Sequence, residues 1–241
     1  MQIPVVRGVI DRRILINYRI EPTVVESLLP TPFRPKLVRG YGMVGVCLIR
    51  LKQVRPRLFP KAVGVASENA AHRIAVEWHE NGELREGVFI PRRDTSSRFN
   101  ALVGGRLFPG LHHHARFRVH EQNGHYSVSM DSDDDAAHLS VEACAADELS
   151  DGSVFGSLSE ASEFFQRGSV GYSNTADQME FDGLELRSFN WKVTPLTVEK
   201  VVSSYFQRHE AIPPDSIAFD SAMLMTNIEH EWHARPPICS N

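Results

Sequence analysis

The feature that most restricts the fold of this chain is a repeated alternation of apolar and polar residues with a period of two. In the segment HRIAVEWHE, Ile74, Val76 and Trp78 alternate with charged or small residues. This is the pattern of a β-strand that buries one face. The dipeptide Asn81-Gly82 follows and favours the positive φ angles of a two-residue hairpin turn. The sequence therefore predicts that the next segment, ELREGVFIPRR, returns antiparallel to the first.

A second hairpin is predicted around Asn123-Gly124, where the segments HARFRV and HYSVSM flank the turn and alternate in the same way. Helical segments are few, and Pro22 and Ser157 begin two of them at positions that favour a helix start. Further strands are predicted within residues 5–20, 41–54, 137–145, 184–206 and 216–232, and short helices within 22–30, 94–108 and 157–168.

These strands predict a mainly β fold of the α+β class, an antiparallel closed β-barrel or a pair of packed sheets with a few short helices. The sequence contains neither a fixed repeat nor a linker, so residues 1–241 are expected to form a single domain. The acidic stretch DSDDDAAH, residues 131–138, is expected to be a loop and a site of flexible excursion.

Composition and charge exclude several classes of protein. The formal net charge of the 241 residues is −4, whereas a nucleic-acid-binding domain is normally basic. No apolar run approaches the ~18 residues that span a membrane, and the N-terminus lacks a leader pattern. We therefore expect a cytoplasmic protein without a nucleic-acid or membrane partner. The three cysteines form no C-x-x-C motif, and Cys47 in VGVCLI is expected to be a small buried apolar residue.

Three consecutive histidines, His112, His113 and His114, begin the first strand of the second hairpin. Strand geometry places His113 with the apolar set and the other two on the opposite, polar face. An H-x-H pair can supply two ligands to a metal, with a third from the segment IEHEWHARP. The basic residues on that polar face argue against a dication. The histidines could instead transfer protons, or simply be polar residues at the start of a strand.

Arginines and carboxylates surround the end of the first hairpin. The segment IPRRDTSSR contains Arg92 and leads into a predicted helix, and Arg106 follows. Arginines near a helix N-terminus can hold a carboxylate or a phosphate, although surface ion pairs are an equally simple interpretation. Glu68 precedes this region, and Glu77 lies between Val76 and Trp78. Either carboxylate could be a general acid or base if its face lines a cavity, and is otherwise an exposed surface group.

The motifs of several common activities are missing. The sequence contains no G-x-S-x-G nucleophile motif and no G-x-x-x-x-G-K phosphate loop. Nothing in it points to a bound nucleotide, so no cofactor is predicted.

Three segments carry a family resemblance: residues 87–119 around IPRRDTSSRFNALVGGRLFPGLHHH, residues 181–196 (FDGLELRSFNWKVTPL) and residues 228–236 (IEHEWHARP). They resemble an uncharacterised, YqjF-like domain of unknown function in the acetoacetate decarboxylase-like superfamily. The resemblance implies a cone-like antiparallel β-barrel with short helices around a mostly apolar pocket.

The chain departs from the decarboxylase at the catalytic segment. In that enzyme a lysine after a Gly-Phe-Pro turn forms a Schiff base with a β-keto acid. The similar segment here, residues 107–114, reads LFPGLHHH and contains no lysine. Imidazole cannot form the iminium, so Schiff-base decarboxylation is not expected. A histidine in this place could still donate a proton or stabilise an oxyanion.

The sequence thus predicts a pocket protein for a small carboxylate-bearing or keto-type metabolite. Arg92 or Arg106 would hold the anion, and one or more of the three histidines would carry protons together with Glu68 or Glu77. Two alternatives stay open: a non-catalytic binder or sensor, and a metal-dependent hydrolase that uses His112 and His114. Homo-oligomers are compatible with either. The predicted lining or core residues are Trp78, Phe89, Phe117 and Trp191.

Overall fold

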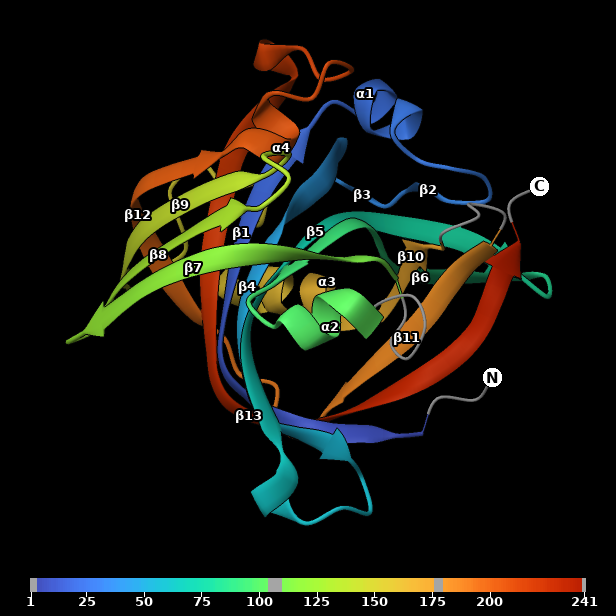
Figure 1. The fold of residues 1–241 in the computed structure, drawn as a ribbon. Helices are drawn as coiled ribbons and strands as arrows, with labels where there is room; N and C mark the ends of the chain where they lie inside the picture. Colours follow the sequence, from blue (N-terminus) through green and yellow to red (C-terminus); the bar gives the residue numbers. More distant parts are fainter. Residues whose placement is uncertain (1–3, 104–109, 176–179, 240–241) are drawn as a thin grey trace.

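The computed structural model describes residues 4–103, 110–175 and 180–239, and strands dominate it (Figure 1). This confirms the predicted mainly β fold with a few short helices. The long strands are β1 (Val6–Ile20), β4 (Tyr41–Pro56), β5 (Val65–Glu80), β6 (Glu83–Thr95), β7 (His112–Gln122) and β13 (Ile217–Cys239). The shorter strands are β2 (Arg34–Pro35), β3 (Leu37–Val38), β8 (His125–Ser132), β9 (His138–Ala145), β10 (Val170–Asn174), β11 (Glu180–Ser188) and β12 (Thr194–Ser203).

The helices are short and begin where the sequence indicated. Pro22 starts α1 (Pro22–Ser27). Ser157 caps α3 (Leu158–Arg167), because its side chain accepts a hydrogen bond from the Glu160 amide. The remaining helices are α2 (Arg98–Val103), α4 (Ser204–Gln207) and the 3₁₀ turns η1 (Lys61–Val63) and η2 (Pro214–Ser216). No helix among the described residues is long and apolar enough to cross a membrane.

The strands form one large sheet whose pairing returns on itself. One circuit runs from β6 through β7, β8, β9, β12, β13, β1, β4 and β5 back to β6. A second circuit runs from β6 through β10 and β11 to β13 and returns through β1, β4 and β5. Figure 1 shows the β7, β8, β9 and β12 strands along one side of the molecule and β10 and β11 along the other. The strands shared by both circuits are β13, β1, β4, β5 and β6, and they separate two interior sides. We call the side enclosed with β7, β8, β9 and β12 the first side, and the side enclosed with β10 and β11 the second side.

The strand pairing is antiparallel except at β6, which has two short parallel pairings. Residues 171–173 of β10 pair with residues 88–90 of β6, and residues 112–114 of β7 pair with residues 93–95. Parallel neighbours need a crossover connection, and the segment with α2 lies between β6 and β7 in the chain. The purely antiparallel prediction was wrong at these two places, and the second of them brings the histidines beside Arg93 and Asp94.

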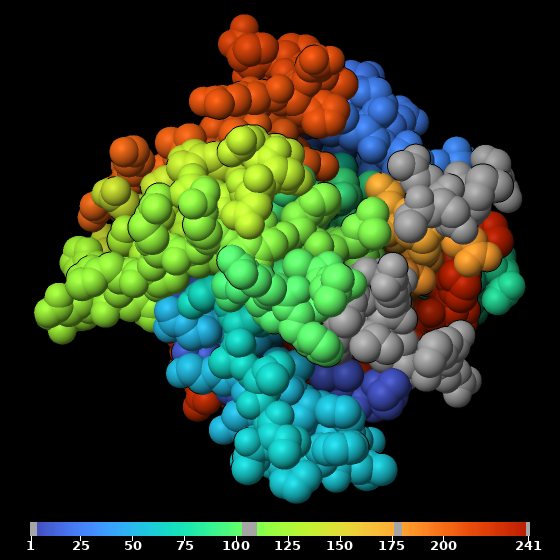
Figure 2. All heavy atoms as spheres, in the orientation of Figure 1, coloured from blue at the N-terminus to red at the C-terminus, as the bar shows by residue number. Residues whose placement is uncertain are grey.

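The predicted hairpin turns are confirmed. Asn81 and Gly82 have φ angles of 53° and 82°, and Asn123 and Gly124 have φ angles of 51° and 80°. These are the positive values that a two-residue turn of this kind requires. Figure 2 shows the β7–β8 hairpin projecting from one edge of the molecule.

The loop predicted within residues 131–138 is confirmed as a short turn, residues 133–137, between β8 and β9. Asp134 anchors the turn by accepting hydrogen bonds from the Ser132 hydroxyl (2.6 Å) and the Ala136 amide (3.2 Å). Aspartate side chains commonly stabilise turns by bonding nearby backbone N–H groups in this way.

The core has two parts because the shared strands are buried on both faces. On β4, Val46 and Leu48 belong to one cluster, and Met43 and Cys47 belong to the other. The first cluster includes the inward residues of β8 and β9, whereas the second packs against α3 through Phe165. The strand predicted within residues 41–54 is therefore confirmed, and both of its faces are buried over most of its length.

Gly45 lies at a point where β4 approaches β1 very closely. A Cβ atom added to Gly45 would lie 2.1 Å from the backbone oxygen of Ile16, so the strands would have to separate. We expect Gly45→Ala to lower the free energy of unfolding by about 3 kcal/mol or more, which is the upper range for overpacking. Urea unfolding measures this.

Gly168→Ala is the matched control. The added Cβ would meet Phe165 O at 3.3 Å and Val88 Cγ1 at 3.4 Å, and φ is −76°. We expect its effect to stay within about 1 kcal/mol. Equal losses in the two variants would contradict the close approach of β1 and β4.

Candidate functional site

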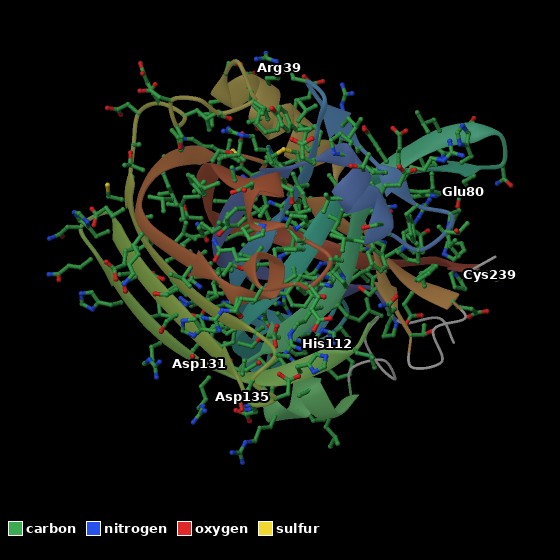
Figure 3. The ribbon with its side chains drawn as sticks, turned by 90° about the horizontal axis from the view of Figure 1, so that it is seen from above. Arg39, Glu80, His112, Asp131, Asp135 and Cys239 are labelled. Carbon is green, nitrogen blue, oxygen red and sulfur yellow. The ribbon has the colours of Figure 1, made fainter. Side chains whose placement is uncertain are left out.

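The parallel pairing of β6 with β7 divides the histidines between the two interior sides. Arg93 is in register with His112, and Asp94 is in register with His113. Since neighbouring residues on a strand point to opposite faces, Asp94 and His113 share one side, and Arg93 and His112 share the other. Figure 3 shows His112 on the same edge of the molecule as Asp131 and Asp135 of the acidic turn.

On the first side, Arg92 lies between two carboxylates. Its Nη2 is 2.7 Å from Asp94 Oδ1 and 2.8 Å from Asp134 Oδ1. His113 Nδ1 lies 3.0 Å from Asp134 Oδ2. Burial raises the pKa of Asp94 in spite of Arg92. The pKa of Asp134 is far below its usual range, because hydrogen bonds from Arg92 and Ser132 outweigh its partial desolvation. The charge of Arg92 is therefore already compensated by the protein.

His72 lies behind this group and is fully buried. Its ring stacks against Tyr205 with centroids 4.4 Å apart, and its Nδ1 is 3.9 Å from Asp94 Oδ2. Burial and the charge of Arg92 lower the pKa of His72 to about 3, so this histidine is neutral at pH 7. Neither ring nitrogen has a hydrogen-bond partner among the described residues.

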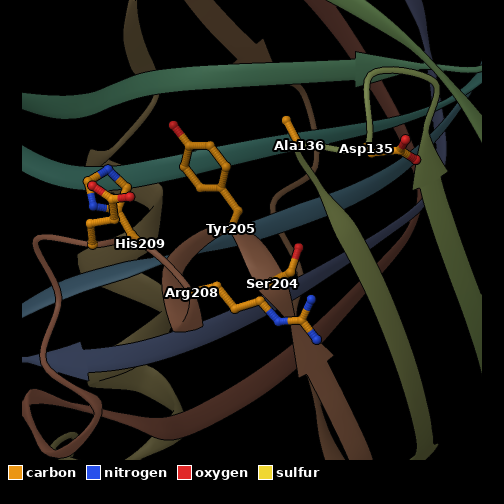
Figure 4. A pocket seen from close by; sticks show the side chains of 7 residues that line it. Asp135, Ala136, Ser204, Tyr205, Arg208 and His209 are labelled. Carbon is orange, nitrogen blue, oxygen red and sulfur yellow. The ribbon is translucent and has the colours of Figure 1, made fainter.

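Two open clefts lie on the outer surface of the described part of the chain. One has a volume of about 440 Å³ and is lined by Tyr205, Arg208 and His209, with Asp135 opposite them (Figure 4). The other has a volume of about 750 Å³ and lies between Arg19 and the segment 146–152. Neither of these two clefts is lined by any of the predicted site residues.

On the second side, Arg93 donates from Nε and Nη2 to the Ser173 hydroxyl at 3.1 and 3.0 Å. Gly110 approaches both groups, since an added Cβ would lie 2.7 Å from Ser173 Cβ and 3.2 Å from Arg93 Nε. Its φ of 79° also favours glycine. Burial lowers the pKa of Arg93 to about 10. This guanidinium is therefore held in a desolvated place against β10.

His112 lies beside Arg93 and is neutral at pH 7. Burial and the Arg93 charge lower the pKa of His112 to about 4. Its Nδ1 is 3.0 Å from the carbonyl oxygen of Gly110. A carbonyl oxygen accepts, so Nδ1 must carry the proton, and the Nε2 lone pair is then available to accept another. The polar strand face predicted for His112 is thus a desolvated interior side at this end of β7.

Two further arginines point to the second side. Arg13 Nη2 donates to Cys47 Sγ at 3.5 Å. Arg73 donates from Nη2 to Asn17 Oδ1, and this side chain is only 5% exposed. Cys47 is 2% exposed. Burial raises the pKa of Cys47, but the charges of Arg73 and Arg13 and their hydrogen bonds lower it overall.

We call Arg13, Arg73 and Arg93, together with Cys47, the arginine cluster. Among the described residues, no carboxylate lies within 4.0 Å of any of these three guanidinium groups. By contrast, the buried Arg12 on the first side has Glu68 and Glu121 at 2.5 Å each. None of the acidic residues that the structure describes therefore forms an ion pair with the cluster, and the Asp182 charge acts on Arg93 without such a contact.

The sequence did not single out Arg13, Arg73 or Cys47 as site residues. Arg73 does lie on the face of its strand opposite to Trp78, between Ala71 and Ala75. Small neighbours on a face that also carries a long cation are a weak signal of a second buried side. Burial of this face can be inferred only when the second circuit of strands, through β10 and β11, is known.

The other predicted site residues are dispersed. Glu68 is held by Arg12 and Arg50 at 2.5 Å each. Glu77 pairs in register with Arg34 and Glu86, away from β7. His114 Nδ1 bonds Asp133 Oδ2 at 2.7 Å. Arg106 lies outside the described residues. The catalytic and binding roles of these residues stay predictions.

The predicted aromatic residues pack as core. Trp78 and Phe89 are buried and both contact Phe33, with ring centroids 5.7 and 5.5 Å apart. Phe117 is partly buried against the first cluster, and Trp191 donates to the Ser162 hydroxyl at 2.9 Å. The core half of the prediction is confirmed for Trp78 and Phe89, and contact with a ligand stays a prediction.

A family model described as DUF2071, an uncharacterized conserved protein, matches residues 10–222. The chain belongs to this family. The matched range contains the whole arginine cluster and the three histidines. A comparison with curated proteins finds no match.

Solved structures with a similar fold include acetoacetate decarboxylases and an enzyme of enduracididine biosynthesis. Acetoacetate decarboxylase from Legionella pneumophila aligns with a TM-score of 0.55 and 11% identity over 96% of this chain and 87% of that one. An acetoacetate decarboxylase-like enzyme from Sphingomonas wittichii aligns with a TM-score of 0.57 and 10% identity over 100% of this chain and 94% of that one. The enduracididine biosynthesis enzyme MppR, complexed with pyruvate, aligns with a TM-score of 0.59 and 8% identity over 100% of this chain and 91% of that one. The predicted superfamily is confirmed at the level of the fold.

The metal hypothesis finds little geometric support among the described residues of this DUF2071 chain, where no group of three or more His, Cys, Asp or Glu is arranged to hold an ion. His112 bonds Gly110 and His114 bonds Asp133. In the segment IEHEWHARP, His230 is buried against Trp232, and His233 bonds Glu231 at 3.1 Å.

Asp134 should contribute to acid stability. Its pKa is lower in the folded chain than in the unfolded one. Its contribution is therefore complete above the unfolded value of about 3.9 and is lost as the pH falls below it. We expect Asp134→Asn to reduce the fall in unfolding free energy between about pH 5 and pH 2 by ~1 kcal/mol, because partial exposure screens the charge.

Asp135→Asn is the control, since Asp135 is exposed and asparagine tolerates its positive φ of 56°. Urea unfolding of both variants across that pH range is the measurement. If the two variants follow the same pH dependence, the Arg92–Asp134 contact does not anchor the turn.

Proposed function

We propose that this protein binds a small carboxylate- or keto-type metabolite at the arginine cluster and that His112 moves a proton on it, without a Schiff-base lysine. The observation that carries the proposal is the set of three guanidinium groups, of which Arg73 is 5% exposed and Arg93 is desolvated. No carboxylate of the described residues lies within 4.0 Å of any of them. The first side lacks this property, because Arg92 already has Asp94 and Asp134.

The physical argument is the cost of isolated charge. A buried cation without a counter-charge costs several kcal/mol, and a bound anion offsets that cost. Guanidinium groups suit a carboxylate because their N–H donors match its two oxygens. Arg93 uses Nε and Nη2 on Ser173, so its Nη1 is left for a ligand. The binding role that the sequence gave to Arg92 thus passes to its neighbour, Arg93.

Substrate binding would also strengthen His112 as a base. The Arg93 charge is one of the two main causes that lower the pKa of His112. A carboxylate bound to Arg93 offsets that charge and raises the pKa of His112 toward the range useful for proton transfer at pH 7. The Nε2 lone pair would then take a proton from carbon or oxygen of the bound metabolite.

The positions of the lysines support chemistry without an imine. Lys36 is paired with Glu86 at 2.5 Å and lies over the Phe164 ring. The remaining four lysines are exposed: Lys52, Lys61, Lys192 and Lys200. An exposed amine does not lie in the desolvated setting that activates a Schiff-base lysine.

A non-catalytic binder is the second candidate, and one observation favours it. Glu68, which would have completed an acid–base pair, is engaged by Arg12 and Arg50. Without a second titratable partner, the arginine cluster could hold an anion and leave it unchanged.

Thermal unfolding in the presence of pyruvate and acetoacetate tests the binding. A ligand at a hundredfold excess over its Kd stabilises a protein by ~2.7 kcal/mol. We expect both anions to raise the Tm of the wild type, and the neutral ketone acetone to leave it unchanged. Arg93→Gln should lose most of the shift.

Arg116→Gln is the control, because that side chain is 73% exposed on the outer face of β7. It should retain the full shift. A shift that persists in Arg93→Gln, or one that acetone also produces, would contradict binding at the cluster.

Turnover of either anion would distinguish an enzyme from a non-catalytic binder. Mass analysis after borohydride treatment should show no lysine adduct, and an adduct would contradict the lysine-free chemistry.

A further inference from the structure

The arginine cluster contains one group that can change its charge in response to a ligand. Cys47 lies on the face of β4 that belongs to the second cluster, and Arg13 Nη2 donates to its sulfur at 3.5 Å. Arg73 comes from the neighbouring strand β5, where Gly45 is its register partner on β4. The thiol is therefore in the position that a counter-ion would occupy.

The charged and titratable groups around Cys47 come from every neighbouring element. Arg13 on β1, Arg73 on β5 and Arg93 on β6 interact with Cys47 itself. The groups that interact with these arginines are His112 on β7 and Asp182 on β11, beside Arg93, and His230 on β13, beside Arg13. The α3 helix contributes the uncharged ring of Phe165, 4.7 Å from the Arg73 guanidinium.

The histidines carry no charge, and the aspartate forms no ion pair with the arginines, although its charge acts on Arg93. Burial lowers the pKa of both His112 and His230 to about 4, so neither carries charge at pH 7. Asp182 accepts a weak hydrogen bond from the Gly110 amide at 3.4 Å and lies more than 4.0 Å from the described guanidinium groups. Cys47 is thus the group that directly contacts a cluster guanidinium and can become an anion.

We propose that Cys47 is the resident counter-ion of the arginine cluster, ionised when the site is empty and protonated when a carboxylate binds. This inference rests on the proposed function, since it concerns the same site. The exchange is balanced: the carboxylate brings one negative charge, and the thiolate sulfur takes one proton from solvent and loses its negative charge. No bond to carbon forms, and nothing is oxidised or reduced.

Electrostatics supports the ionised form of the empty site. Burial alone raises the pKa of Cys47, but the charges and hydrogen bonds of Arg73 and Arg13 lower it overall. A thiol next to arginine commonly ionises below its free value of about 8.5. A second anion beside the sulfur reverses this effect, because like charges disfavour each other in a desolvated place.

The sign of the pH dependence follows. Below the pKa of Cys47 in the empty protein, the thiol is neutral, and an anion meets the full charge of the arginines. Above that pKa, binding must first protonate the thiolate, so affinity falls by up to about tenfold for each pH unit. Proton uptake approaches one per ligand between the pKa values of the empty and the occupied site.

The first experiment measures the thiol in the ligand-free protein. In a Cys144→Ser, Cys239→Ser background, the ultraviolet absorbance of the thiolate reports Cys47 alone. We expect half-ionisation below about 8.5, and Arg13→Gln to move it upward while Arg116→Gln leaves it in place. Half-ionisation at or above the free value, or no response to Arg13→Gln, would overturn the proposal whatever the ligand does.

The second experiment measures the coupling. Titration calorimetry with pyruvate in two buffers of different protonation enthalpy gives the number of protons taken up. The titrations are made above about pH 8, where His112 stays neutral with and without the ligand. We expect uptake approaching one in the wild type and in Cys144→Ser, and zero in Cys47→Ser, whose affinity for pyruvate should be independent of pH in this range.

The outcomes separate the two proposals. Pyruvate binding without proton uptake, or uptake that persists in Cys47→Ser, overturns the role of Cys47 and leaves the proposed function standing. If neither pyruvate nor acetoacetate binds the wild type, the proposed function fails and the coupling fails with it. The thiol titration still decides whether Cys47 is an ionised counter-ion.

Discussion

The account depends on the energetic cost of burying guanidinium groups away from carboxylates. The arginines on the two sides of the sheet have different kinds of partner. On the first side, Arg12 and Arg50 share Glu68 and Glu121, and Arg92 has Asp94 and Asp134. On the second side, Arg13, Arg73 and Arg93 donate to neutral groups or to a thiol. Compensated charge is sufficient for stability, whereas uncompensated charge needs a further explanation.

The local geometry that creates this difference is the pairing of β6 with β7. Their three-residue parallel register puts consecutive histidines beside Arg93, Asp94 and Thr95. The alternation of strand side chains then sends His113 to the compensated side and His112 to the uncompensated one. The single run of histidines in the sequence therefore occupies two chemical environments, and only His112 has a guanidinium group, that of Arg93, as its partner in register.

The local features of the fold could be predicted from the sequence. The Asn-Gly turns, the Pro22 helix start and the Ser157 cap depend on a few adjacent residues, so they are readable without knowledge of the rest of the chain. The resemblance of residues 87–119, 181–196 and 228–236 to an uncharacterised family also proved informative, since the DUF2071 match and the decarboxylase-like fold agree with it.

The features that sequence reasoning missed are non-local. The pairing of β10 and β11 with β6 and β13 encloses the second side, and no pattern within residues 65–80 reveals that both faces of β5 are buried. Arg73 therefore read as a residue of the polar face, and Cys47 as a simple apolar one. The contact that holds the turn at residues 133–137 is non-local for the same reason, because Arg92 lies on a distant strand.

Comparison of the two sides shows where a ligand would matter most. The first side has its charges matched and gains little from an added anion. The second side has three cations, a neutral histidine with an available lone pair and an ionisable thiol within one group of strands. An anion bound there, even weakly, would change the electrostatic environment of the arginines, the histidine and the thiol.

Anomalous diffraction from crystals soaked in bromide, at a pH below the Cys47 pKa found by the thiol titration, tests this claim most directly. The account predicts a bromide ion among the guanidinium groups of Arg13, Arg73 and Arg93. Bromide found at exposed arginines such as Arg116 and Arg118, with those three guanidinium groups in contact with protein atoms alone, would contradict it.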